Sequence, residues 1–197
     1  MGQKNGSTPL LPAEYQQVEW IQVSASTYQR LPVAPSITMK IELDIAHSGN
    51  GNVMICSTYQ SGTIWRIMKH ASVSQNKYAF RCLYSENDAK TNVSTNDRVT
   101  VILDAPNDLF KASDSAVSVP TSSNTAPPSR PYLGGTITTG GSPTVKIWGA
   151  KQYNSNVLVA DCVPCYRKVD NVIGLYDLVS GTFEGANGTN ATKGADV

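Results

Sequence analysis

The sequence predicts an all-β fold, a sandwich of two antiparallel sheets, and three observations support this expectation. Apolar and polar residues alternate along many short segments, as they do in strands with one buried face. Turn residues such as Asn-Gly and Ser-Gly separate these segments at short intervals. No segment shows the sustained period of about 3.6 residues that a helix with one apolar face requires. We therefore expect about ten to thirteen short strands in a sandwich or jelly roll.

Length and composition are those of one large domain. The chain has 197 residues, enough to bury a core without disulfides. We expect a flexible arm at residues 1–10 and a single sandwich domain at residues 11–197. Charged residues make up 16% of the chain and the formal net charge is +1, so neither nucleic acid nor a membrane is expected as a partner. No apolar run approaches the roughly 20 residues that span a bilayer.

The clearest strand is expected at residues 37–46, where every second side chain from Ile37 to Ile45 is apolar. The residues between them, including Glu42 and Asp44, are expected on the opposite face. Further strands are expected at residues 53–59, 63–70, 77–84 and 98–103, separated by turns at 48–52, 61–62 and 72–76 and by a polar loop at 85–92. Residues 104–131 are expected to form a long connection with one short strand at 116–119.

The C-terminal part predicts a series of strands separated by turns. Residues 144–150 alternate, with Val145, Ile147 and Gly149 on one face and Lys146, Trp148 and Ala150 on the other. Strands at 157–160 and 172–177 and from Thr182 onward follow, with turns at 154–156 and 180–181 and a loose tail at 184–197 that can form one edge strand. Each strand has an apolar face too small to be stable alone, so each requires a second layer.

Two segments of the chain resemble a known family. Residues 164–183, PCYRKVDNVIGLYDLVSGTF, are similar to the C-terminal part of laminin-G-like, concanavalin A-like jelly-roll domains of phage and prophage virion proteins and gut-bacterial surface proteins. Residues 11–21, LPAEYQQVEWI, match near the start of these domains. The resemblance covers about half of the chain and implies a fold, whereas such folds host many different activities.

The resemblance implies a non-enzymatic virion structural or attachment protein: a head-decoration, head-fibre or tail-associated subunit. Its expected partners are host-surface glycans, other virion subunits and copies of itself in a homo-oligomer. Virions assemble in the host cytoplasm, and residues 1–7 contain no apolar segment of the kind found in a signal peptide. The alternatives are a carbohydrate-binding lectin module of a bacterial surface protein, located at the cell surface, and a glycoside hydrolase of the concanavalin A-like fold.

Residues 42–47, ELDIAH, are the strongest enzymatic candidate. Family-16 β-glucanases share the concanavalin A-like fold and carry a Glu-x-Asp-x-(x)-Glu pattern on their active strand. Glu42 and Asp44 match its first two carboxylates, but His47 stands where the last is required. Retaining hydrolysis requires two carboxyl groups about 5–5.5 Å apart, and an imidazole differs from a carboxyl group in geometry and pKa. We therefore expect no enzyme, and the two acids are equally explained as the polar face of a half-exposed strand.

Aromatic residues provide a second candidate site, because sugars stack on exposed aromatic rings. Trp65 shares a strand with Arg66, and Tyr59 lies in the strand before it. Large aromatic residues also commonly fill the core between two sheets, which is the alternative explanation. The aromatic residues considered are Trp20, Trp65, Trp148, Tyr59, Tyr78, Tyr84 and Tyr153. The predicted ligand-binding set is Trp65, Tyr59, Arg66, Glu42 and Asp44.

The four cysteines predict no cofactor. Cys56 and Cys82 lie in apolar strand patterns and are expected to be buried free thiols. Cys162 and Cys165 have CxxC spacing, but a zinc site requires a second pair of ligands and a thioredoxin-type motif precedes a helix. We expect structural thiols here, with a disulfide or a metal as the alternatives. No Asp-x-Asp-x-Asp-Gly loop or Gly-x-Ser-x-Gly elbow is present, so neither a calcium site nor a serine hydrolase is expected.

Overall fold

The structure is a computed structural model that describes part of the chain. The residues that it describes are 11–24, 26–48, 53–60, 63–72, 75–82, 85–90, 97–118, 129–134 and 144–197. Within residues 53–90, side chains are described for residues 55–58 and 67, and the other described residues there by their backbone alone. The expected arm at residues 1–10 and the turns at 49–52 and 61–62 lie outside the described residues.

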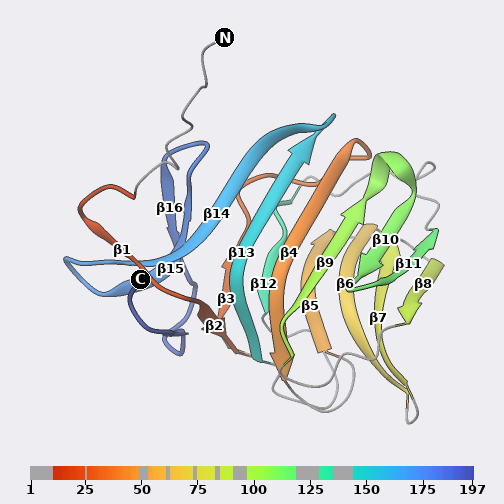
Figure 1. Ribbon diagram of the computed structural model, residues 1–197, viewed down its shortest axis with the longest axis horizontal. Coiled ribbons are helices and arrows are strands. Elements are labelled where there is room, and N and C mark those ends of the chain that lie inside the picture. The colour runs from red at the N-terminus through yellow and green to blue at the C-terminus, as the bar shows by residue number, and fades with distance from the viewer. Residues whose placement is uncertain are drawn as a thin grey trace.

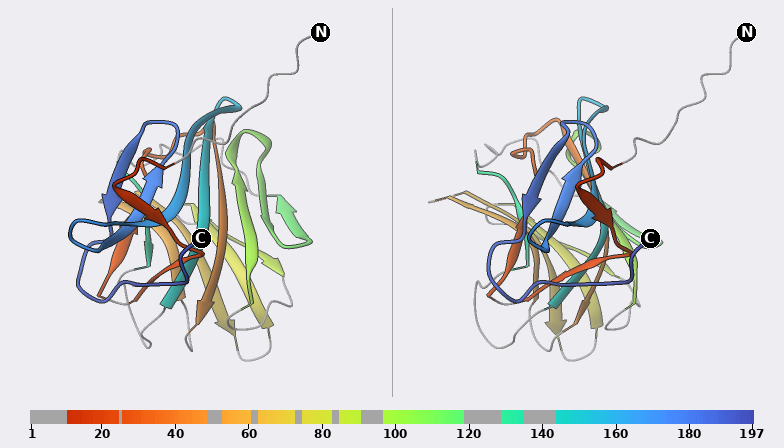
Figure 2. Two further views of the ribbon diagram at one scale, coloured as in Figure 1. Left: turned by 60° about the vertical axis from the view of Figure 1, so that its left-hand side comes forward. Right: turned by 90° about the vertical axis from the view of Figure 1, so that its left-hand side faces the viewer.

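The chain forms two antiparallel sheets, which Figures 1 and 2 show as separate layers. The larger sheet has eleven strands. Its main order is β11 (Ser115–Ser118), β10 (Leu109–Ala112), β9 (Val99–Asp104), β4 (Met39–Ser48), β13 (Thr144–Asn154), β14 (Val157–Arg167), β15 (Val172–Asp177) and β16 (Thr182–Gly185). Beside this order, β1 (Tyr15–Gln17) pairs with β14, β2 (Ile21–Val23) with β13, and β17 (Thr192–Lys193) with β2.

The smaller sheet has six strands and lies behind the larger one in Figure 1. Its order is β3 (Tyr28–Arg30), β12 (Tyr132–Gly134), β5 (Val53–Gln60), β6 (Thr63–Ser72), β7 (Gln75–Cys82) and β8 (Ser85–Lys90). The described residues include one short 3₁₀ helix, η1 (Ala105–Asn107), and no α-helix. The predicted all-β sandwich of two antiparallel sheets is thus confirmed, whereas its jelly-roll form stays a prediction. No helix in this part of the chain is long and apolar enough to cross a membrane.

Among the described residues, buried apolar side chains from both sheets form one cluster between them. In β4, Met39, Ile41, Leu43 and Ile45 are all buried, as their alternation predicts. They pack into the same cluster as apolar residues of the smaller sheet, including Ile55, Ile67 and Leu133. The outward residues of β4 are therefore free to form a surface.

The β13–β14 hairpin confirms the predicted turn but is longer than expected. Ser155 and Asn156 have φ values of 48° and 64°, the left-handed conformation that a two-residue hairpin turn requires. The prediction ended the returning strand at residue 160, whereas β14 continues through Pro164 to Arg167. A proline cannot donate to a ladder, but its carbonyl accepts a hydrogen bond from the Val18 amide at 3.1 Å. The strand can therefore pass through this position.

Two segments that the sequence predicts as loops are strands. Residues 85–90 form β8, an edge strand paired with β7, instead of part of a polar loop. An edge strand needs no apolar alternation, so the sequence of an edge strand can resemble that of a loop. Residues 104–131 contain β10 in addition to the strand near 116–119. Phe110 and Ala112 of β10 are fully buried, but two apolar residues are too short a pattern to identify from sequence.

The C-terminal segment is paired with the start of the domain. The sequence predicts a loose tail that can form one edge strand, and β17, paired with β2, is such a strand. The tail is not loose, however, because Asp196 bridges to Val18 and the Val197 amide donates to the carbonyl of Gln17 at 3.1 Å. Its Gly, Asn and Thr residues carry no apolar pattern, so only these backbone contacts identify it as part of the sheet.

Three cysteines are buried free thiols: Cys56, Cys162 and Cys165. Cys162 and Cys165 lie three positions apart on one extended strand, which separates their Cα atoms by roughly 10 Å. A disulfide requires a separation below about 7 Å, so this strand does not allow one between them. Burial raises the pKa of Cys56 and of Cys165 to about 12, and raises the pKa of Cys162 as well. The side chain of Cys82 lies outside the described part of the chain.

We expect these thiols to resist modification in the folded protein. The thiolate is the reactive form, and both burial and a raised pKa keep its population low near neutral pH. A Cys82→Ser variant, which leaves Cys56, Cys162 and Cys165, should react with Ellman's reagent at pH 8 at least about 100-fold more slowly when native than in guanidinium. Rapid modification of native protein would show that these cysteines are exposed in solution.

The same thiols predict how stability depends on pH. Their pKa is raised from 9.0 in the folded state, so above pH 9 the folded protein still holds protons that the unfolded chain has released. The free energy of unfolding should therefore fall as the pH rises from 9 toward 12. Denaturation curves of the wild type and of Cys56→Ala across this range measure the slope, which should be shallower for the variant.

Candidate functional site

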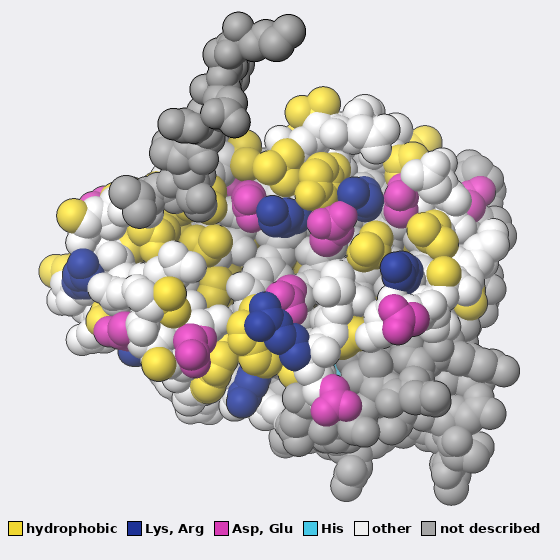
Figure 3. Space-filling view, viewed as in Figure 1, with side chains coloured by type: hydrophobic (Ala, Val, Ile, Leu, Met, Phe, Trp, Pro, Cys, Tyr) yellow, Lys and Arg dark blue, Asp and Glu magenta, His cyan; other side chains and the backbone are white. Residues whose placement is uncertain are grey.

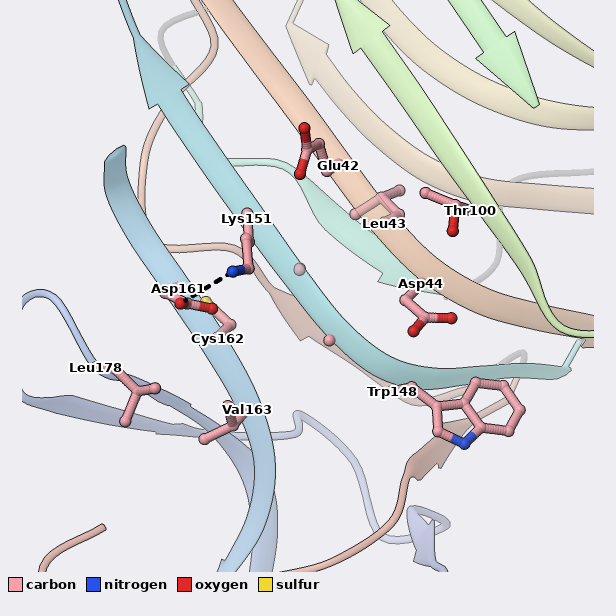
Figure 4. A pocket seen from close by; sticks show the side chains of 12 residues that line it. Glu42, Leu43, Asp44, Thr100, Trp148, Lys151, Asp161, Cys162, Val163 and Leu178 are labelled. Carbon is pink, nitrogen blue, oxygen red and sulfur yellow. Dashed lines mark ion pairs between the residues drawn. The ribbon is translucent and has the colours of Figure 1, made fainter. Parts of the chain in front are cut away.

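A cleft of about 450 Å³ lies on the outer face of the larger sheet, the face turned away from the core (Figure 4). Its walls come from β4, β9, β13 and β14 and from the turn after β15. Six lining residues have polar or aromatic side chains that could contact a ligand: Glu42, Asp44, Thr100, Trp148, Lys151 and Asp161. Val163 and Leu178 add an apolar wall.

Strand register brings the polar residues together. Glu42 of β4 is opposite Lys151 of β13, which is opposite Asp161 of β14. Figure 4 shows Lys151 and Asp161 pointing toward each other, with 3.3 Å between Nζ and Oδ2. The next row places Asp44 opposite Thr100 of β9. Side chains opposite one another on the same sheet face lie within contact distance, so the two rows form one continuous polar surface.

A β-bulge places Trp148 at the edge of this surface. Ile147 pairs with Ile45 and Gly149 pairs with Asp44, so Trp148 is an extra residue without an opposite partner on β4. Bulges commonly re-aim a side chain next to a functional site. The ring of Trp148 is partly exposed and lines the cleft. Beside it, Gly149 leaves the floor bare, since an added Cβ would meet only the carbonyl oxygen of Cys162, at 3.5 Å.

The bulge also corrects the predicted face of two residues. Simple alternation placed Gly149 on the core side and Ala150 on the outer side. In the structure Ala150 is buried and Gly149 lines the cleft, because the extra residue reverses the phase of the strand after Ile147. A bulge leaves little trace in a single sequence beyond a glycine inside an alternating pattern.

Arg98 holds Asp44 and Trp148 in place. Its Nε donates to Asp44 Oδ1 at 2.7 Å and its Nη2 to Oδ2 at 2.5 Å, a bidentate pair. The guanidinium carbon lies 4.9 Å from the centroid of the Trp148 ring, within the range of a cation–π contact. The hydrogen bonds to Asp44 raise the pKa of Arg98 above its ordinary value. Arg98 does not itself line the cleft, so it supports the site from outside.

The charges around the cleft balance. Glu42 pairs with Lys40 at 2.8 Å, Asp44 with Arg98, and Asp161 with Lys151. Lys40 also lies 4.1 Å from the centroid of the Tyr153 ring, and the hydrogen bond to Glu42 raises its pKa. Three carboxylates thus face three cations. Basic and acidic side chains are interspersed over this face of the molecule (Figure 3).

The predicted site residues are divided between the two sheets. Glu42 and Asp44 share one face and line the cleft, as alternation predicts. Tyr59 belongs to β5, and Trp65 and Arg66 to β6, all in the smaller sheet, and their side chains lie outside the described part. The strand order therefore separates the two halves of the predicted set.

His47 does not lie beside the two acids. It is only 1% exposed, follows the core-facing alternation of Ile45 and is not part of the cleft wall. His47, which stands where the β-glucanase pattern requires its last carboxylate, thus lies on the opposite face of β4 from Glu42 and Asp44. No group of three or more His, Cys, Asp or Glu residues that could hold a metal ion occurs among the described residues.

Fold and cleft together define the class of the protein: an all-β sandwich with a charge-balanced, tryptophan-edged cleft on the outer face of its larger sheet. A scan against protein-family models matches no family, and a search of the curated proteins finds no match. The likeness to concanavalin A-like domains stays a prediction based on residues 11–21 and 164–183.

Proposed function

We propose that this protein is a non-enzymatic attachment module that binds a glycan in the cleft beside Trp148. The observation that supports this most directly is the partly exposed Trp148 ring, placed by a bulge next to the bare backbone of Gly149. A pyranose ring can stack on an indole while nearby polar groups bind its hydroxyls. A volume of about 450 Å³ is within the roughly 300–1,000 Å³ of small-molecule sites.

The arrangement of acids favours binding over hydrolysis. A glycosidase requires one carboxyl group to be protonated as the acid and a second to act as nucleophile or base. Here Glu42 and Asp44 each have a cationic partner within 2.8 Å, and His47 lies on the other face of the strand. Carboxylate oxygens accept hydrogen bonds, which suits the recognition of hydroxyl groups.

The resemblance of residues 11–21 and 164–183 supports a phage virion as the setting. In this proposal the protein is a head-decoration, head-fibre or tail-associated subunit that assembles as a homo-oligomer and contacts host-surface glycans or other virion subunits. A lectin module of a bacterial surface protein would use the same cleft. Mass spectrometry of purified particles and of the cell envelope distinguishes the two locations, and light scattering gives the oligomeric state.

The glycan-binding function is tested with Trp148→Ala. An array of bacterial surface glycans should yield ligands for the wild type, and calorimetry should show about two- to tenfold weaker binding by the variant, since a stacked aromatic contact is worth about 0.5–1.5 kcal/mol. Tyr28→Ala is the matched control, because it removes another aromatic ring that contacts an arginine, Arg30, outside the cleft. Its affinity should equal that of the wild type.

Two outcomes would contradict the proposal. The first is the absence of any glycan ligand for folded wild-type protein. The second is equal affinity of Trp148→Ala and wild type for the array ligand, which would locate binding elsewhere. Circular dichroism of both variants establishes that they are folded, so loss of binding can be assigned to the site.

A further inference from the structure

The charged side chains that line the cleft are mostly acidic. Three lining residues are carboxylates, Glu42, Asp44 and Asp161, whereas Lys151 is the one lining cation among the described residues. Lys40 and Arg98 balance two of these acids but do not line the cleft. A ligand in the cleft therefore meets mainly hydrogen-bond acceptors.

These acceptors have capacity left for a ligand. A carboxylate offers about four lone-pair positions, two on each oxygen. Arg98 donates one hydrogen bond to each oxygen of Asp44. Glu42 uses Oε1 for Lys40 and Oε2 for the Tyr153 hydroxyl, at 3.4 Å. Asp161 uses Oδ2 for Lys151. Each acid can accept at least one more hydrogen bond, and sugar hydroxyls supply such donors.

The basic residues are poorly placed to receive an anion. Arg98 is held by two hydrogen bonds to Asp44 and by its contact with Trp148, on the outside of the cleft. Lys40 is held between Glu42 and the ring of Tyr153. An acidic group bound near Lys151 would lie beside Asp161, with like-charge repulsion that offsets the attraction.

From these contacts we propose that the cleft selects neutral sugars and rejects acidic ones. This inference rests on the glycan-binding function proposed above and adds the class of ligand. One pyranose face stacks on Trp148, and hydroxyls donate to Glu42, Asp44 and Asp161. Sugars with carboxylate, sulfate or phosphate groups bind poorly because the lining acids repel them.

The test compares sugars of the same ring and different charge. Glucose, galactose and mannose oligosaccharides and the corresponding uronic acids are titrated into the full chain by calorimetry at 20 mM and 150 mM salt. The neutral member of at least one series should bind at least about tenfold more tightly than its acid, which corresponds to about 1.4 kcal/mol. The difference should shrink at the higher salt concentration, because screening weakens the repulsion.

Two isosteric variants test the origin of the selectivity. Asp161→Asn and Glu42→Gln keep the size of the side chain and remove one negative charge each. Both variants should therefore reduce the ratio of the affinities for neutral and acidic sugars several-fold. Asp170→Asn is the matched control, since it removes an exposed acid that does not line the cleft. Asp170→Asn should leave the ratio of these affinities unchanged.

The possible outcomes separate the two proposals. If a uronic acid binds as tightly as its neutral counterpart, or more tightly, and Trp148→Ala weakens that binding, the neutral-sugar inference is overturned. Glycan binding at the cleft is then left intact. Failure of every sugar to bind folded protein would overturn both proposals.

Discussion

Replacing Phe110 with alanine is expected to lower the free energy of unfolding by about 3–5 kcal/mol. Phe110 is 0% exposed and is among the largest fully buried side chains that the structure describes. It lies on β10, which pairs with β9 on one side and β11 on the other. Removing the ring leaves a cavity that a packed sandwich can only partly close, which adds to the lost burial of apolar surface.

Chemical denaturation measures this loss directly, and the melting temperature should fall by roughly 6–20 °C for a domain of this size. Phe183→Ala is the matched control: Phe183 is half-exposed, and its ring lies 5.0 Å from that of Tyr15. Phe183→Ala should lower the free energy of unfolding by less than half as much as Phe110→Ala. If Phe110→Ala changed the free energy of unfolding by less than about 1 kcal/mol, this would contradict the burial of β10 and favour the loop that the sequence predicts there.

Replacing Asp177 with alanine is expected to lower the free energy of unfolding by about 3 kcal/mol or more, because its carboxylate, 2% exposed, accepts four part-buried hydrogen bonds. The donors are the amides of Asp161 at 2.8 Å, Val179 at 3.1 Å and Ser180 at 3.3 Å, and the Ser180 hydroxyl at 2.6 Å. Alanine would leave these donors without their acceptor. Asparagine keeps one oxygen acceptor and should show a smaller loss.

Denaturation curves of Asp177→Ala, Asp177→Asn and Asp170→Ala test this expectation. Asp170, like Asp177, accepts several hydrogen bonds, in its case from Arg167 and from a backbone amide. Because Asp170 is exposed, its removal should change the free energy of unfolding little. Equal effects of Asp177→Ala and Asp170→Ala would contradict a structural role for the buried acid. Because Asp177 holds the backbone of Asp161, its loss should also weaken ligand binding in the cleft.

Local pattern was a reliable guide where a strand has one buried and one exposed face. The strand around Glu42 and Asp44 was identified, with its faces, because alternation is written into neighbouring residues. The hairpin turn at Ser155 and Asn156 was found for a similar reason, since turn residues favour the left-handed conformation locally.

Strands stabilised mainly by pairing were missed. β8 has a polar, charged sequence and is a strand because β7 offers it a ladder. β10 contributes two buried residues, Phe110 and Ala112, too few to show a period. β17, which the sequence allowed as one edge strand but did not locate within the tail, has two residues and is formed through its pairing with β2. In each case the hydrogen bonds that define the strand join residues whose relation a single sequence does not show.

The sequence by itself determined the class of fold and the common face of Glu42 and Asp44, because both follow from a two-residue period within one strand. Only the tertiary structure decided that Trp148, Lys151 and Asp161, more than 100 positions along the chain, complete that surface while Tyr59, Trp65 and Arg66 belong to the other sheet. The reason is that strand order, register and the bulge at Trp148 depend on pairing between distant segments, and one extra residue reverses every side chain that follows it.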